Sequence, residues 1–272
     1  MGVWLVAEDR DTPYDGSRET PNPLQERTTI RVLLLTSDVR LTTNLGVQVS
    51  ATVPDVTRSG VVTLPGRSLS FSETFRGLGD TSVIGWYRVP NSIGWNVTVN
   101  GGLSLPTGKT ERPRFRAELD DDSLVPVSRL QRGSGTVDPL VGVSANRVFS
   151  GIFPPGTRVF VNAAARLPVQ ENEYGLRTGA SWEVGAGASR EFLWHPLIAL
   201  GRLSWLHRAQ DVFEGVPVLV GGGQWFVFSP GLAWGVGKMT IQGEVRLPLH
   251  RALANRQLDS SRTWQLGAVY KF

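Results

Sequence analysis

The sequence predicts an all-β fold, a transmembrane antiparallel up-and-down β-barrel of about twelve strands that occupies residues 1–272 as a single domain. Three observations predict it. Apolar and polar residues alternate with a period of two in segment after segment of barrel-strand length. The longest apolar runs, such as residues 32–35, are far shorter than the roughly 18 residues that a transmembrane helix needs. Short and long connections alternate along the chain, which is typical of bacterial outer-membrane barrels.

The bulk composition is compatible with this fold. A mean hydropathy of -0.09 does not argue against a membrane location, because a barrel directs its polar residues inward on alternate positions. The chain has no cysteine, which excludes disulfides, thiolate nucleophiles and cysteine-ligated metals. Its net charge is +4, but the basic residues are dispersed along the strands, so we expect no nucleic-acid partner. The first residues lack the features of a secretory signal, and we expect the chain to begin at or after a processing site.

The first four predicted strands cover residues 2–10, 27–36, 44–54 and 78–89. Pro54 ends the third of them. Proline has no N–H for the hydrogen-bond ladder, so it marks the point where strand pairing stops. Pro106, Pro168 and Pro248 end later predicted strands in the same way.

The next three predicted strands cover residues 94–107, 135–148 and 157–169. In the first of them, Val97 and Val99 alternate with Thr98 and Asn100. Each such segment therefore has one face that suits lipid and one that suits water.

Five further strands, at residues 175–188, 194–207, 222–235, 238–250 and 261–272, complete the barrel. The last has Trp264 and Leu266 on one face and Thr263 and Gln265 on the other, and it ends on an aromatic residue. A terminal strand of this kind is what outer-membrane barrels present to the barrel assembly machinery, so the assembly signal is predicted at Tyr270 and Phe272.

The loops predict an orientation. Short turns are expected near residues 37–38, 90–92, 150–156, 189–193 and 235–238, and long loops at 11–26, 55–77, 108–134, 208–221 and 251–260. The short connection at 170–174, on the side of the long loops, is the exception. Short turns face the periplasm in this class of barrel, so the chain ends are expected there too.

Charged residues of both signs are expected on the inner face. The candidates for the lumen lining are Arg31, Asp80, Arg88, Asp138, Arg158, Arg166, Arg177, Glu183, Arg202, Glu244 and Arg246. Two interpretations stay open. The charges pair across the barrel and narrow it, or they contact a passing solute, in which case the excess of arginine favours a modest preference for anions.

No catalytic, metal or cofactor site is predicted, and the chain is not expected to be an enzyme. The three histidines, His195, His207 and His250, have no convincing catalytic neighbours, and Ser204 is expected to face away from His207. The acidic run at residues 118–122 lies in the longest predicted outer loop and lacks the spacing of a calcium site.

Several short motifs resemble a known family. They are Gly77-Leu78-Gly79-Asp80, Trp86-Tyr87-Arg88, residues 102–108, residues 133–139 and the closing residues 267–272. These segments resemble the outer-membrane transporter family labelled "meta-pathway of phenol degradation", a small relative of the long-chain fatty acid and aromatic-hydrocarbon outer-membrane channels. The resemblance implies a barrel that transports small solutes, and it carries over no binding residue.

We therefore expect a channel of the bacterial outer membrane for passive uptake of small solutes, hydrophobic or aromatic ones among them. The alternative is a non-conducting structural barrel that acts as an anchor or subunit of a larger cell-envelope complex. The expected partners are the lipid bilayer and lipopolysaccharide, the barrel assembly machinery during biogenesis, a small-molecule solute and, in the alternative, other envelope proteins.

Overall fold

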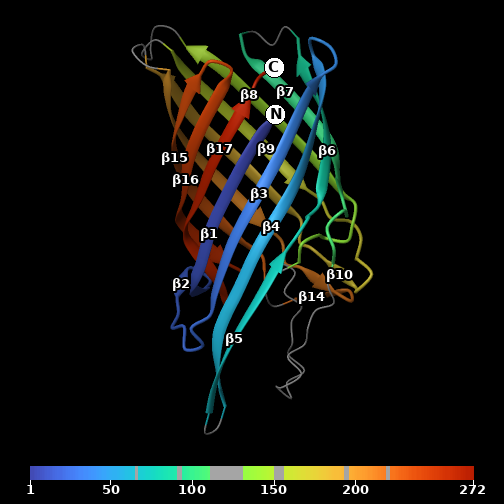
Figure 1. Cartoon of the computed structure of the whole chain (residues 1–272), viewed down its shortest axis with the longest axis vertical. Coiled ribbons are helices and arrows are strands. Elements are labelled where there is room, and N and C mark those ends of the chain that lie inside the picture. The colour runs from blue at the N-terminus through green and yellow to red at the C-terminus, as the bar shows by residue number, and fades with distance from the viewer. Residues whose placement is uncertain (65–66, 91–93, 111–130, 150–155, 193–195, 219–220) are drawn as a thin grey trace.

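The computed structural model describes residues 1–64, 67–90, 94–110, 131–149, 156–192, 196–218 and 221–272. Within this part the chain forms a tall barrel with loops and one long hairpin at its lower end (Figure 1). The described residues contain no helix that is both long enough and apolar enough to cross a membrane. The twelve wall strands are β1(Gly2–Asp15), β3(Arg27–Arg40), β4(Leu45–Leu64), β6(Thr81–Val89), β7(Asn96–Leu105), β8(Asp138–Phe149), β9(Thr157–Arg166), β11(Ser181–Glu191), β12(Leu197–Arg208), β15(Gly223–Val236), β16(Met239–Leu253) and β17(Gln257–Tyr270).

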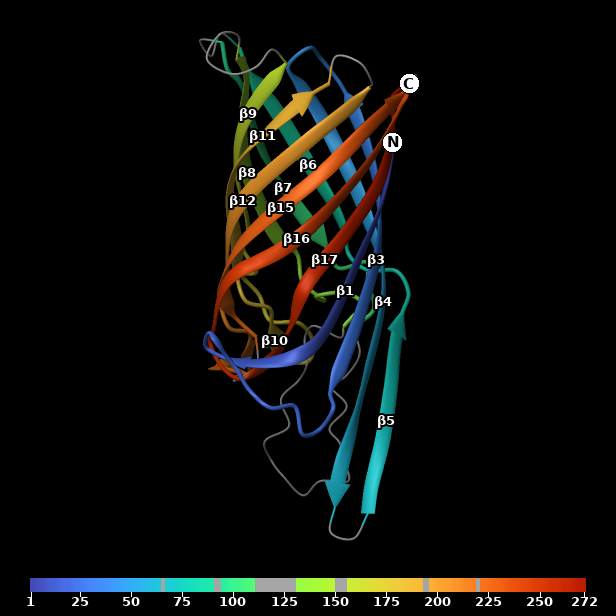
Figure 2. The same ribbon diagram turned by 90° about the vertical axis from the view of Figure 1, so that its left-hand side faces the viewer.

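The barrel is closed by its first and last strands. Each wall strand pairs antiparallel with the next wall strand along the chain, and β17 returns to pair with β1 from Gly2–Val269 to Tyr14–Gln257. The predicted closed antiparallel barrel of twelve strands is therefore confirmed. Both chain ends lie at the end with the short turns, and the tilt of the strands is clear in the side view (Figure 2).

The loop end contains more regular structure than predicted. β4 continues beyond the barrel wall and pairs with β5(Arg67–Arg76) to form a long hairpin, where a loop was expected at 55–77. β2(Arg18–Glu19) pairs with the end of β1. β10(Leu176–Arg177), β13(Val212–Phe213) and β14(Val216–Pro217) make a small separate sheet, so the strand predicted from residue 175 begins only at Ser181.

One predicted turn is displaced. Residues 37–38 lie inside β3, which runs on to Arg40, and the chain reverses at residues 41–44, where the backbone N–H groups of Leu41 and Thr42 donate to the Leu45 carbonyl. Ser37 and Asp38 interrupt the apolar alternation, but it resumes at Val39, which is exposed and still pairs with Val47 of β4.

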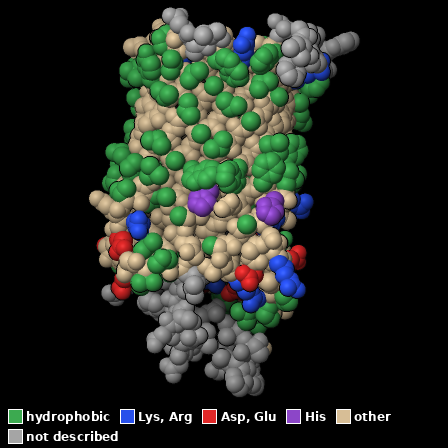
Figure 3. All heavy atoms as spheres, turned by 180° about the vertical axis from the view of Figure 1, so that it is seen from behind, with side chains coloured by type: hydrophobic (Ala, Val, Ile, Leu, Met, Phe, Trp, Pro, Cys, Tyr) green, Lys and Arg blue, Asp and Glu red, His purple; other side chains and the backbone are tan. Residues whose placement is uncertain are grey.

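The outer face of the wall is apolar, as the alternation predicts. Hydrophobic side chains cover it on the face seen in Figure 3, while acidic side chains gather toward the loop end. Large exposed hydrophobic residues recur at every second position on most wall strands: Val3, Leu5, Leu33, Leu35, Val83, Val99, Leu103, Val141, Val143, Val161, Val184, Leu203, Phe226, Phe228, Leu232, Trp234, Trp264, Leu266 and Tyr270.

Two tryptophans, Trp4 and Trp86, face the inside of the barrel. Trp4 pairs in register with Gly267, and a Cβ at Gly267 would lie 2.1 Å from the indole ring. Trp86 covers Gly46 in the same way and donates its indole N–H to Asp38 at 2.9 Å. These glycines leave the room that a large ring needs to lie flat on the inner wall.

Candidate functional site

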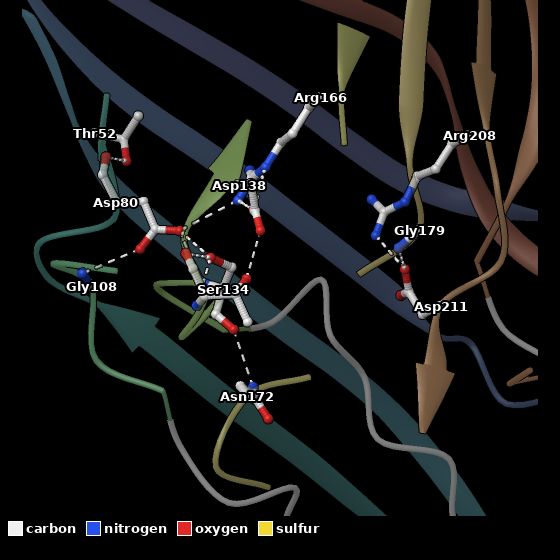
Figure 4. Close-up of polar contacts among 11 residues, drawn as sticks. Thr52, Asp80, Gly108, Ser134, Asp138, Arg166, Asn172, Gly179, Arg208 and Asp211 are labelled. Carbon is white, nitrogen blue, oxygen red and sulfur yellow. Dashed lines mark hydrogen bonds and ion pairs between the residues drawn. The ribbon is translucent and has the colours of Figure 1, made fainter. Parts of the chain in front are cut away.

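The inner wall carries a polar cluster near the loop end, which we call the mouth cluster: Asp80, Ser134, Asp138 and Arg166 (Figure 4). Asp138 begins β8 and has no exposed surface. It accepts hydrogen bonds from Arg166 Nε at 2.8 Å, from Arg166 Nη2 and from the Thr136 hydroxyl at 2.7 Å. Two guanidinium bonds to one buried carboxylate fix both side chains in place.

Asp80 joins two loop segments to this cluster. Its carboxylate accepts from the backbone N–H and the hydroxyl of Ser134, both at 2.8 Å, and from the Gly108 N–H at 3.3 Å. Its other neighbour is Arg166, 3.5 Å away. Asn172 donates to the Ser134 carbonyl from a third loop. The described end of the long loop, residues 131–136, is therefore tied to the inside of the barrel.

A second group of contacts lies beside the mouth cluster. Asp211, almost fully buried, accepts from Arg208 Nη2 at 2.8 Å and from the Gly179 N–H at 2.7 Å (Figure 4). These contacts hold the loop with β13 against β12. A cavity of about 400 Å³ lies between the two groups and includes Leu34, Ser82 and Arg132 in its lining.

Deeper in the barrel, four charged side chains form a chain of ion pairs, which we call the lumen quartet: Glu183, Arg202, Glu244 and Arg246. Arg202 lies 3.0 Å from Glu244 and 3.6 Å from Glu183. Arg246 lies 3.4 Å from the other oxygen of Glu183. The four come from only three strands, β11, β12 and β16, so they form a shelf on one side of the lumen.

A cavity of about 540 Å³ lies between this shelf and β1. Glu183 and Arg246 line it, with Glu8 and Arg10 of β1, which form an ion pair of their own. Its apolar lining includes Ile84, Leu140, Ala164, Leu206, Trp225, Val227 and Pro248.

Two predicted lumen residues lie elsewhere. Arg31 has the same register as Leu33 and Leu35 and is exposed on the outer wall, so its prediction is wrong. Arg177 lies in β10, which pairs with β13 and not with the barrel wall. Arg88 and Arg158 have inward registers, opposite Thr98 and Ser189, but lie near the short-turn end and are exposed.

Some inner charged residues were missed by sequence reasoning. Arg251 of β16 stacks over Tyr14 at 4.2 Å and lies 3.5 Å from Asp259, which also accepts from the indole of Trp225. A bulge in β16 explains the miss. His250 pairs with Phe226 and Pro248 with Val227, so one residue is extra and Arg251 turns inward.

The predicted assembly residues lie at the barrel seam. The backbone N–H of Tyr270 donates to the Met1 carbonyl at 2.8 Å, and the rings of Tyr270 and Phe272 meet edge to face at 5.0 Å. Their role in assembly stays a prediction.

Ser204 and His207, the serine and histidine considered for catalysis, lie on opposite faces of the wall. Ser204 is buried and faces inward, whereas His207 stacks on Trp182, which shares the outward register of Val184. No group of three or more metal-binding side chains occurs in this part of the chain. His195 and the acidic run at residues 118–122 lie outside the described residues.

Comparison with known proteins agrees on the fold. No family model matches the sequence, and no curated protein matches it. Among solved structures, the COG4313 outer membrane channel from Pseudomonas putida F1 superposes with a TM-score of 0.70 at 13% identity, covering 100% of this chain and 94% of the channel. The β domain of the Bordetella autotransporter BrkA gives 0.54 at 13% identity, covering 100% and 99%. The transport unit of the autotransporter AIDA-I from Escherichia coli gives 0.52 at 11% identity, covering 100% and 89%. At these identities the likeness concerns the fold.

Proposed function

We propose that this chain is an outer-membrane channel that lets small solutes diffuse through its barrel. The observation that carries the proposal is the pair of cavities, about 400 and 540 Å³, that lie on the inner side of a barrel whose outer face is apolar. Spaces of this size suit small molecules. The fold shared with an outer-membrane channel supports the same function.

The membrane orientation follows from the loops. Short turns and both termini lie at one end, and the long hairpin and the small sheet lie at the other. By the rule for outer-membrane barrels, the first end faces the periplasm and the second the cell exterior, where lipopolysaccharide surrounds the barrel. Tyr270 and Phe272 then lie at the periplasmic rim, where we expect the assembly machinery to recognise them.

The solute that we propose is small, and hydrophobic or aromatic compounds are included. The apolar part of the larger cavity supports this, since Leu140, Leu206, Val227 and Trp225 contribute to its lining. The family resemblance of the sequence suggests the same solutes.

A different observation supports a second candidate function. The mouth cluster holds residues 131–136 inside the barrel, and the lumen charges pair with one another. A barrel filled in this way could serve as a non-conducting anchor or as a subunit of a larger envelope complex.

Single-channel recording of the purified barrel in planar bilayers separates the two functions. We expect discrete conductance steps from the channel. A folded barrel that inserts and carries no current would overturn the channel and favour the structural role. The double variant Arg166→Gln/Arg246→Gln is the informative comparison, because in a plugged barrel it would loosen the filling and raise the current from near zero.

A further inference from the structure

The inner charges are closer to balance than the sequence indicates. Two of the arginines that were predicted to line the lumen lie elsewhere: Arg31 on the outer wall and Arg177 in the small sheet. Two acids that the sequence did not assign, Glu8 and Asp259, line the larger cavity. Each arginine that lines this cavity has an acidic partner: Arg10 with Glu8, Arg166 with Asp138, Arg208 with Asp211 and Arg246 with Glu183.

The lumen quartet contributes two of its four side chains to this lining. Its members alternate in sign, Glu244, Arg202, Glu183, Arg246, so the net charge is zero. Glu183 and Arg246 line the cavity. Their contact of 3.4 Å is longer than an ideal charge-assisted hydrogen bond. Arg202 contacts Glu183 from the other side and keeps that carboxylate between two cations.

We propose that Glu183 and Arg246 are the specificity-determining residues of this channel, and that Arg202 is the positioning residue that holds Glu183. An ion that approaches the pair meets both signs within a few ångströms. The attraction of one partner is then offset by the repulsion of the other, and the field of the pair falls off faster than that of a single charge. This part of the lumen therefore discriminates weakly by charge.

The same geometry favours a particular class of solute. Arg246 offers N–H donors and Glu183 offers an acceptor side by side, while Leu206, Val227 and Pro248 supply an apolar wall. A small, uncharged, dipolar molecule with both a donor and an acceptor satisfies both partners without disturbing the balance. This inference rests on the proposed channel function and narrows its substrate class.

Reversal potentials under a potassium chloride gradient test the proposal. We expect the wild-type ratio of K⁺ to Cl⁻ permeability to lie near unity. Glu183→Gln leaves Arg202 and Arg246 in excess and should shift the ratio toward Cl⁻ by roughly threefold, and Arg246→Gln should shift it toward K⁺ by a similar factor. The double variant should return to the wild-type ratio. All shifts should shrink in about 1 M salt, where the screening length is about 3 Å.

Arg202 is tested separately. Arg202→Gln should shift the ratio toward K⁺, and Arg202→Lys, which keeps the charge, should restore it. Arg31→Gln is the matched control, because it removes an arginine from the outer wall of the same barrel and should change nothing.

The outcomes distinguish this inference from the channel function. A conducting wild type whose ratio does not respond to Glu183→Gln or Arg246→Gln overturns the assignment of the two residues and leaves the channel standing. A strongly selective wild type overturns the charge balance proposed for the lumen quartet. A folded barrel without current overturns both the channel and this inference.

Discussion

The mouth cluster and the lumen quartet both pair arginine with carboxylates, but the surroundings of the carboxylates differ. Asp138 is fully buried and receives three hydrogen bonds, two of them from Arg166. The quartet has contacts of 3.0 to 3.6 Å, and its side chains keep 9 to 23% of their surface exposed. The difference lies in the carboxylates: Asp138 has no exposed surface, whereas Arg166 keeps 36% of its side chain exposed. Removing Arg166 would therefore leave a buried negative charge without its partner. Both carboxylates of the quartet keep some exposed surface, so a solute can replace one of their partners.

The largest effect should come from removing the cation of the mouth cluster. Arg166→Met leaves the wholly buried Asp138 carboxylate without its guanidinium and should lower the free energy of unfolding by about 3–5 kcal/mol. Reversible unfolding in lipid vesicles measures this. Adding Asp138→Asn should recover much of the loss. If the second change recovers nothing, the buried charge is not the cause.

A smaller loss is expected in the quartet. Arg202→Met still leaves Glu183 with Arg246 but takes the partner of Glu244, so we expect a loss of about 1–3 kcal/mol in the same unfolding assay. A loss equal to that of Arg166→Met would break the distinction between the fully buried Asp138 carboxylate and the partly exposed carboxylates of the quartet.

The attachment of residues 131–136 can be tested at Asp80. Asp80→Asn removes the charge and one acceptor that serves Ser134 or Gly108, at an expected cost of about 1–2 kcal/mol. Hydrogen exchange at the Ser134 amide should become faster. Glu173→Gln, which alters an exposed loop contact with Thr110, is the control and should leave that amide unchanged.

The smallest effect is expected on the outer wall. Arg31→Gln should change the free energy of unfolding by no more than about 0.5 kcal/mol, since exposed positions of this kind tolerate substitution. A loss above 2 kcal/mol would show that Arg31 makes contacts on which the fold depends.

The alternation in the sequence predicted the strands of the wall. In some strands it did not predict which residues face inward. Alternation is unambiguous in β7, where Val99 faces out and Asn100 faces in. In β3 both faces are apolar, because Ile30, Val32 and Leu34 face in while Leu33 and Leu35 face out. Alternation in such a run does not tell the two faces apart, which is why Arg31 was assigned to the lumen.

The missed parts of the site depend on contacts between distant segments. The bulge that turns Arg251 inward follows from pairing with β15 and has no signature within β16 alone. Strands of two residues, such as β10, are too short to show a period. The pairing of Trp4 with Gly267 joins the two ends of the chain, and only the closed barrel makes it visible.

The long hairpin of β4 and β5 extends beyond the barrel wall, so the chain can be cut there without breaking a ladder of the wall. Beyond Ser59, β4 has left the ladder with β3, and in the described part of the chain β5 pairs with β4 alone. A protease cut between β4 and β5 would give one fragment with three wall strands and another with nine. The ladder from Leu45–Tyr87 to Ala51–Thr81 and the ladder between β1 and β17 would still join them. The wall should therefore survive such a cut, and residues 1–64 and 67–272, expressed as separate chains, should reassemble into one barrel.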